Sequence, residues 1–148
     1  MKKIASFKID HDKLEVGFYL SRADGNVSTY DLRFKKPNGR DYLSIAAMHT
    51  IEHLFATAVR SLFENVVYFG PMGCRTGFYL LLFDTDYIKA REMTIETLIA
   101  CLKPDESPGN KRKECGNYRS HSLTEAKQEI EKYLAALDSA PAYQSYSD

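Results

Sequence analysis

The sequence has little cysteine: Cys74, Cys101 and Cys115 are the only three, and they include no C-x-x-C pair. An odd, widely spaced set does not predict a framework of disulfides. It favours a reduced, cytoplasmic compartment, where cysteine serves as a metal ligand, a catalyst or core filler.

The sequence also lacks an excess of charge of either sign, because Lys plus Arg and Asp plus Glu each number 20. Neither nucleic acid nor an anionic membrane is therefore expected as a partner. The longest apolar run, from Phe78 to Phe83, is far too short to span a membrane. No apolar segment follows Lys2 and Lys3, so a signal peptide is not expected.

What the chain does contain is a globular composition, with 44% apolar residues in a length of 148. This length fits one domain with a sizeable core, and no internal repeat suggests otherwise. We therefore expect a single domain over residues 1–148. Its last segment, residues 141–148, is expected to be a loosely ordered tail.

Local patterns predict both strands and helices. Residues 15–21 and 27–34 flank the turn Asp24-Gly25-Asn26 and predict a β-hairpin. Residues 66–69 predict a short strand. Residues 78–83 are apolar on both faces and predict a central strand of the sheet. Helices are expected from a cap at Asp41 or Ser44 to about Leu62, from Tyr87 to about Leu102, and from the capping box at Ser122 to about Leu137. Residues 6–11 read as a short strand or arm.

The stretch around which the chain is organised is His49-Thr50-Ile51-Glu52-His53. On a helix, residues four apart share a face, so both imidazoles reach one point, and Glu52 lies about 60° round the axis from His49. Two imidazoles and a nearby carboxylate suit Zn²⁺ or Fe²⁺ with proton transfer. The pattern H-x-x-E-H is the inverted motif of zinc hydrolases. The alternative is a pair of half-buried histidines satisfied by hydrogen bonds.

Two cysteines compete for a third ligand position. Cys74 lies in a loop rich in glycine and proline, where a thiolate can be presented and Arg75 can favour it. Cys115 lies in a distant turn of the kind that supplies a third ligand and leaves a fourth position open. Spacing alone does not choose between them. Cys101, late in a predicted helix, is expected to be core filler.

These residues belong to a set of motifs that occur in order along nearly the whole chain. The chain resembles the S-ribosylhomocysteine lyase family, the autoinducer synthases of bacterial quorum sensing and methyl-cycle recycling. The motifs that carry the resemblance are Ser6-Phe7 with Asp10-His11, Asp31-Leu32-Arg33-Phe34, His49 to Leu54, Pro71 to Tyr79, and Glu114-Cys115-Gly116-Asn117.

The resemblance implies a small α+β fold, with an antiparallel sheet packed by helices and the metal site on the H-x-x-E-H helix. It implies that His49, His53 and Cys115 bind the metal, with water or substrate as the fourth ligand. It implies that Glu52 and Cys74 form the catalytic acid/base pair. The metal would be Fe²⁺ in the native form, with Zn²⁺ or Co²⁺ as substitutes.

The resemblance further implies that Ser6, His11 and Arg33 hold or assist the substrate, and that the enzyme is a homodimer with two active sites at the interface. The implied reaction splits S-ribosylhomocysteine into homocysteine and 4,5-dihydroxy-2,3-pentanedione.

From the residues alone, Arg33 lies on the more polar face of its strand. An arginine there is usually solvated or paired with a neighbour such as Asp31, and it can also clamp a carboxylate.

Two rival functions remain open on the residues alone. A metal-dependent hydrolase would also use Glu52 as a base, but it would leave Cys74 without a role. A purely structural metal would need a closed fourth ligand, from His11 or His121. Otherwise His121 reads as a polar residue before the last helix.

Overall fold

The structure is a computed structural model that describes residues 1–146. Its sheet contains four antiparallel strands in the order β1-β2-β4-β3. The strands are β1 (Gly17–Asp24), β2 (Val27–Arg33), β3 (Val66–Pro71) and β4 (Gly77–Phe83). The helices are α1 (Ala5–Lys8), α2 (Ile45–Leu62), α3 (Tyr87–Cys101) and α4 (Leu123–Ser139). The α+β class and the antiparallel sheet are therefore confirmed.

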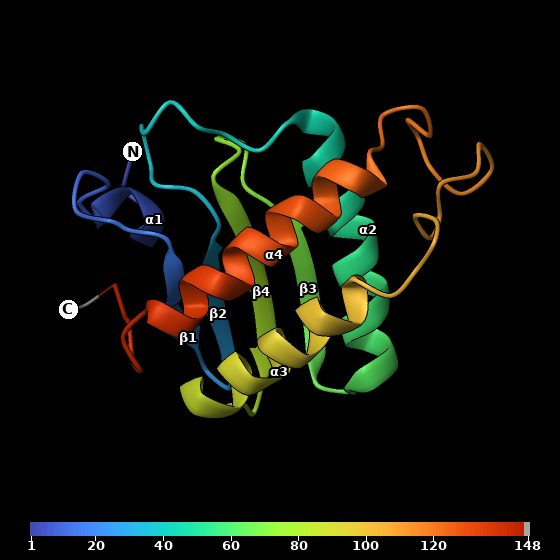
Figure 1. The fold of residues 1–148 in the computed structure, drawn as a ribbon. Helices are drawn as coiled ribbons and strands as arrows, with labels where there is room; N and C mark the ends of the chain where they lie inside the picture. Colours follow the sequence, from blue (N-terminus) through green and yellow to red (C-terminus); the bar gives the residue numbers. More distant parts are fainter. Residues whose placement is uncertain (147–148) are drawn as a thin grey trace.

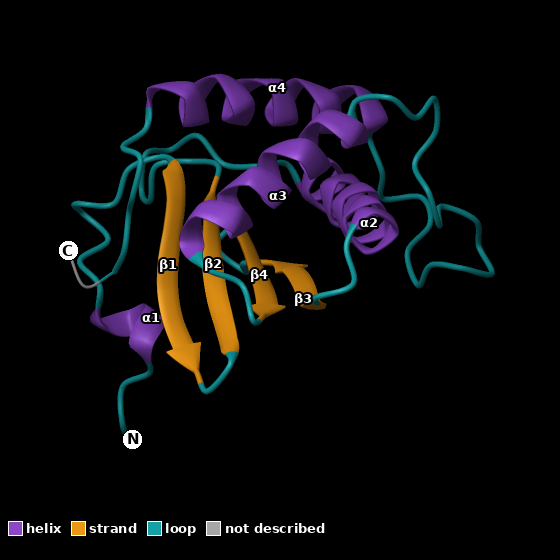
Figure 2. Cartoon of the chain, turned by 90° about the horizontal axis from the view of Figure 1, so that it is seen from below, coloured by secondary structure: helices purple, strands orange, loops and turns teal. Residues whose placement is uncertain are grey.

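Three of the helices, α2, α3 and α4, cover one face of the sheet (Figures 1 and 2). The alternation of β2 and β4 explains this, because one set of side chains enters the core. Tyr30 and Leu32 of β2 meet Phe78 and Leu80 of β4 on that face, and all four are at most 1% exposed. The predicted position of residues 78–83 as a central strand is confirmed, since β4 lies between β2 and β3.

The helix that carries the two histidines begins as the sequence predicts. Ser44, rather than Asp41, is its N-cap, and its hydroxyl accepts a hydrogen bond from the backbone N–H of Ala47. Asp41 is instead paired with Lys35. One face of this helix is apolar, and it is buried at its centre, at Ile51 and Phe55, whereas Ile45 and Leu62 at the two ends are exposed.

Both ends of the chain differ from the prediction. Residues 5–8 form the single helical turn α1 rather than a strand or arm, beside β1 and away from α4 (Figure 2). The prediction of a loose tail is wrong up to residue 146. The backbone of Gln144 and Tyr146 pairs with Leu20 of β1, and the Gln144 side chain accepts from the N–H of Phe18. Residues 147–148 of the predicted tail lie outside the residues that the structure describes.

No helix among residues 1–146 is long and apolar enough to cross a membrane.

Candidate metal centre and active site

The two histidines of α2 are held by backbone carbonyls of the loop between α3 and α4. The Nδ1 of His49 lies 2.7 Å from the oxygen of Ser120, and the Nδ1 of His53 lies 2.9 Å from the oxygen of Pro108. A carbonyl oxygen only accepts, so each Nδ1 carries the proton and each Nε2 offers a lone pair. This is the tautomer that a metal ligand needs, with its orientation fixed by the second partner.

Glycine permits the approach of this loop to α2. Gly109 has a φ of +66°, in the left-handed region that side chains avoid, and a Cβ there would lie 3.2 Å from the Nδ1 of His53. The carbonyl of Pro108 therefore reaches the ring of His53 without obstruction.

Cys115 and His121 complete a cluster of four donor groups. The sulfur of Cys115 lies 3.4 Å from the Nε2 of His49, 4.0 Å from that of His53 and 3.8 Å from that of His121. All four donor atoms lie within 4.8 Å of one another. Tetrahedral bonds of about 2.3 Å to sulfur and about 2.0 Å to nitrogen separate such donors by about 3.5 Å. The residues therefore fit a divalent metal.

The structure brings Cys115, not Cys74, to the two histidines. Spacing alone does not choose between the two cysteines, and it indicates His121 only as a ligand of a purely structural metal. His121 follows Cys115 by only six residues, and this short spacing is the signal that could have placed both residues in one cluster. Burial, together with the neighbouring imidazoles of His49 and His53, lowers the pKa of His121.

Glu52 lies on the same helix, beside His53, and is partly buried. Its carboxylate forms no hydrogen bond or ion pair with another residue in the described part of the chain. A carboxylate that is neither a donor of the cluster nor engaged elsewhere is suited to proton transfer.

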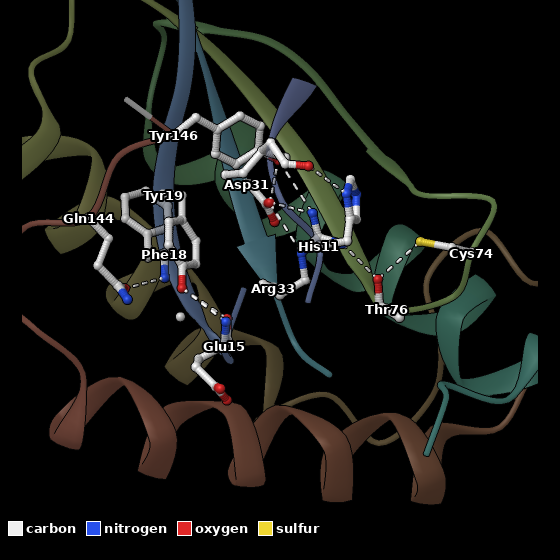
Figure 3. Close-up of polar contacts among 12 residues, drawn as sticks. His11, Glu15, Phe18, Tyr19, Asp31, Arg33, Cys74, Thr76, Gln144 and Tyr146 are labelled. Carbon is white, nitrogen blue, oxygen red and sulfur yellow. Dashed lines mark hydrogen bonds and ion pairs between the residues drawn. The ribbon is translucent and has the colours of Figure 1, made fainter. Parts of the chain in front are cut away.

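Cys74, Arg33 and His11 lie together in a second group, at the ends of β2 and β4 (Figure 3). A cavity of about 370 Å³ is lined by Ser6, His11, Arg33 and Cys74, among others. Four residues singled out in the sequence thus share one cavity. Cys74 itself is exposed.

The turn that presents Cys74 depends on its neighbours. Arg75 has a φ of +61°, which turns the chain sharply back towards β4. At Gly77, where β4 begins, a Cβ would collide with the carbonyl oxygen of Leu32 in β2. The Cys74 loop therefore lies directly over the end of β2.

Arg33 is buried rather than solvated. Its Nε and Nη2 donate to the Oδ2 of Asp31 at 3.2 Å and 2.6 Å, and both residues are at most 1% exposed. Burial raises the pKa of the Asp31 carboxyl, and the Arg33 guanidinium opposes that shift. Burial lowers the pKa of the Arg33 guanidinium, but Asp31 and Tyr146 together raise it by more, so the pKa of Arg33 lies above its usual value. Of the alternatives for Arg33, pairing with Asp31 is therefore the one realised.

Two further side chains join this pair, and the sequence predicts a role for neither of them. Thr76 accepts from the Nη1 of Arg33 at 2.8 Å, and its hydroxyl lies 3.0 Å from the sulfur of Cys74. Tyr146 donates to the Oδ2 of Asp31 at 2.6 Å. Thr76 follows Cys74 by two residues, but nothing in the sequence points to Tyr146.

The two groups are separate within the chain. Among residues 1–146, no hydrogen bond or ion pair directly joins the cluster of His49, His53, Cys115 and His121 to the group around Cys74 and Arg33.

Comparison with known proteins identifies the family to which the chain belongs. Residues 4–143 match the model of the family described as S-ribosylhomocysteinase (LuxS). Proteins named S-ribosylhomocysteine lyase are similar to the chain. Those of Borreliella afzelii, Desulfotalea psychrophila and Clostridium acetobutylicum are 47%, 46% and 44% identical to it. Each alignment covers 93% of this chain, and 94%, 92% and 93% of the respective relative. The chain therefore belongs to the S-ribosylhomocysteinase family.

Proposed function

We propose that the protein is a metal-dependent S-ribosylhomocysteine lyase, which splits its substrate into homocysteine and 4,5-dihydroxy-2,3-pentanedione. The observation that carries the proposal is the convergence of His49, His53 and Cys115 on one point, in a chain that matches the lyase family over residues 4–143. The three unpaired cysteines support a cytoplasmic location.

We propose His49, His53 and Cys115 as the ligands of one divalent metal per subunit, Fe²⁺ in the native enzyme and Zn²⁺ or Co²⁺ as substitutes. Two imidazoles and a thiolate suit any of these ions. When bound, the metal supplies Lewis acidity, which favours negative charge on the sugar oxygens.

The chemistry requires bases at carbon and at oxygen. A thioether sulfur leaves only when it lies β to a carbonyl, so the carbonyl moves from carbon one of the sugar to carbon two and then to carbon three. Each move takes a proton from one carbon and returns it to the next. The elimination then takes the proton from carbon four as the sulfur leaves carbon five, and the sulfur is protonated to give the thiol. We assign the transfers of the two carbonyl moves to the Cys74 thiolate, and the transfers at oxygen and around the departing sulfur, from carbon four to sulfur, to Glu52. The products together contain all the atoms of the substrate, so no water or oxidant is consumed.

Thr76 supports the placement of the Cys74 sulfur at the proposed substrate cavity. Its oxygen accepts from the buried Arg33 guanidinium, so its own proton is available to the sulfur of Cys74. This hydrogen bond fixes the position of the sulfur beside the cavity.

We assign substrate binding to Ser6, His11 and Arg33, which line the cavity beside Cys74. The Nδ1 of His11 lies 3.0 Å from the oxygen of Ile9, which leaves its Nε2 lone pair for a substrate hydroxyl. Arg33 donates four of its five N–H groups to Asp31, Thr76 and Tyr146, so it contributes charge and one hydrogen bond rather than a two-pronged clamp.

We further propose a homodimer with its active sites at the interface. The sheet face opposite the three helices is left largely open by them (Figure 2), and Tyr68 on β3 is 51% exposed. A second copy on this face would cover such side chains. Sedimentation equilibrium is expected to give twice the chain mass of 16.9 kDa, and the mass of one chain would contradict the dimer.

The decisive experiment for the reaction is release of a thiol. Protein loaded with Fe²⁺ or Co²⁺ is incubated anaerobically with S-ribosylhomocysteine, and homocysteine is followed with a thiol reagent. We expect steady, multiple-turnover release that stops when a chelator removes the metal. Folded, metal-loaded protein that releases no homocysteine but cleaves peptides would replace the lyase with the hydrolase.

A further inference from the structure

His121 is the third imidazole and the fourth donor group of the cluster, and the proposed ligand set does not include it. Its ring lies on that of His49, with the centroids 3.9 Å apart and the planes inclined by 25°. Its Nε2 faces the sulfur of Cys115 at 3.8 Å. The question is whether this nitrogen presents a lone pair or a proton to the centre.

The partner of the other ring nitrogen decides the question. The Nδ1 of His121 lies 2.9 Å from the hydroxyl oxygen of Thr50, whereas His49 and His53 each face a carbonyl at that position. A carbonyl only accepts, but a hydroxyl can also donate. The tautomer of His121 therefore depends on where the Thr50 proton points.

Thr50 is completely buried, and its oxygen already accepts from the backbone N–H of Ser122 at 2.9 Å. The buried hydroxyls of Thr94 and Thr97 donate to carbonyls one helical turn back, but Thr50 has no such bond. Within the described residues, the only remaining partner for its proton is the Nδ1 of His121. A buried hydroxyl proton without an acceptor is costly, so Thr50 donates to Nδ1 and the proton of the His121 ring resides on Nε2.

We infer that His121 is a positioning residue of the metal centre and not its fourth ligand: its Nε2–H donates to the Cys115 thiolate. A protonated ring nitrogen has no lone pair for a metal. It can instead donate a charge-assisted hydrogen bond to sulfur, which reduces the electron density that the thiolate gives to the metal. This inference rests on the proposed lyase, and it leaves the fourth position to the substrate. It also removes the rival in which His121 closes that position.

The test uses Co²⁺ as a probe, because its absorption reports both coordination number and the thiolate bond. The variants are His121→Ala, His121→Gln and, as a ligand control, His49→Gln, each loaded with Co²⁺ and challenged with a graded series of chelator. We expect His121→Ala to keep one equivalent of Co²⁺ at chelator concentrations that strip His49→Gln. Loss of a group outside the ligand set lowers metal affinity by only about 10- to 100-fold.

The Co²⁺ spectrum then shows whether His121 donates a hydrogen bond to the Cys115 sulfur or only fills space beside it. We expect the sulfur-to-cobalt charge-transfer band of His121→Ala to move to longer wavelength, with the intensity of the visible bands unchanged. Glutamine carries an amide N–H at a reach similar to that of the imidazole Nε2 and is a poor ligand, so His121→Gln should return the band towards its original position. Loss of Co²⁺ equal to that of His49→Gln, unrescued by glutamine, would show that His121 is a ligand. An unmoved band with Co²⁺ retained would also overturn the proposal.

A second pair of variants keeps the test valid if His121→Ala fails to fold. Thr50→Ser retains the hydroxyl that fixes the tautomer, whereas Thr50→Val removes it at similar volume. Only Thr50→Val should move the charge-transfer band, and equal bands in the two variants would contradict the tautomer argument. Full retention of Co²⁺ by His49→Gln would instead refute the proposed ligand set, whatever His121 does.

Discussion

Replacing Cys74 with alanine should abolish measurable release of homocysteine and leave the bound metal in place. Removing a positioned general acid or base typically costs about 10²- to 10⁴-fold in rate. We expect the upper end, because the same sulfur takes and returns a proton in each of two carbonyl shifts. The metal should stay because the structure places Cys115, and not Cys74, beside His49 and His53. The measurements are thiol release and metal content of the same preparation.

The other two cysteines provide matched controls. Cys115→Ala should lose both metal and activity. Cys101→Ala should keep both, since Cys101 is buried in the core at the end of α3, where burial raises the pKa of its thiol to about 12. Glu52→Gln should behave like Cys74→Ala, with metal bound and turnover lost. Loss of metal from Cys74→Ala but not from Cys115→Ala would mean that Cys74 is the metal ligand and that the two assigned roles are exchanged.

The largest expected effect on stability comes from Arg33→Met. This change leaves the carboxylate of Asp31 buried, at 0% exposure, without its cation. Breaking a buried ion pair from one side typically lowers the free energy of unfolding by about 3–5 kcal/mol. Asp31 is especially vulnerable, because its Oδ1 has no hydrogen-bond partner among the described residues. Urea unfolding at neutral pH measures the change.

A double variant separates lost charge from lost packing. Asp31→Leu combined with Arg33→Met removes both charges at once, and such replacements are often neutral or stabilising. The double variant should therefore be more stable than Arg33→Met alone. If the two proteins unfold at the same urea concentration, the cost lies in packing around Arg33 and not in the orphaned carboxylate.

The elements predicted correctly are those whose side chains follow a local period. Residues 27–34 alternate and 78–83 are continuously apolar, and both patterns survive folding because each strand pairs along its length with its neighbours. The helical position of His49 and His53 is equally local. In the sequence, Asp41 and Ser44 are both candidates for the N-cap of this helix. Ser44 is the cap because the backbone places its hydroxyl at the start of the helix, within reach of the N–H of Ala47.

What could not be predicted depends on where distant segments meet. Cys74 and Cys115 are both cysteines in turns, and only the path of the loop after α3 brings one of them to α2. Tyr146 reaches Asp31 across 115 positions of the chain, which no period encodes. The helical turn α1 is too short to carry a periodic signal at all.

The backbone pairing of Gln144 and Tyr146 with Leu20 bears on how the protein should be handled in the laboratory. These bonds occupy the outer edge of β1, which would otherwise be open to pairing with a foreign strand. The Tyr146 hydroxyl also receives a hydrogen bond from Arg33, while Ser6, near the other terminus, lines the cavity that contains Arg33. A purification tag fused at either terminus therefore lies within a few residues of the proposed substrate pocket. Rates measured on tagged protein should be compared with those of protein from which the tag has been cleaved.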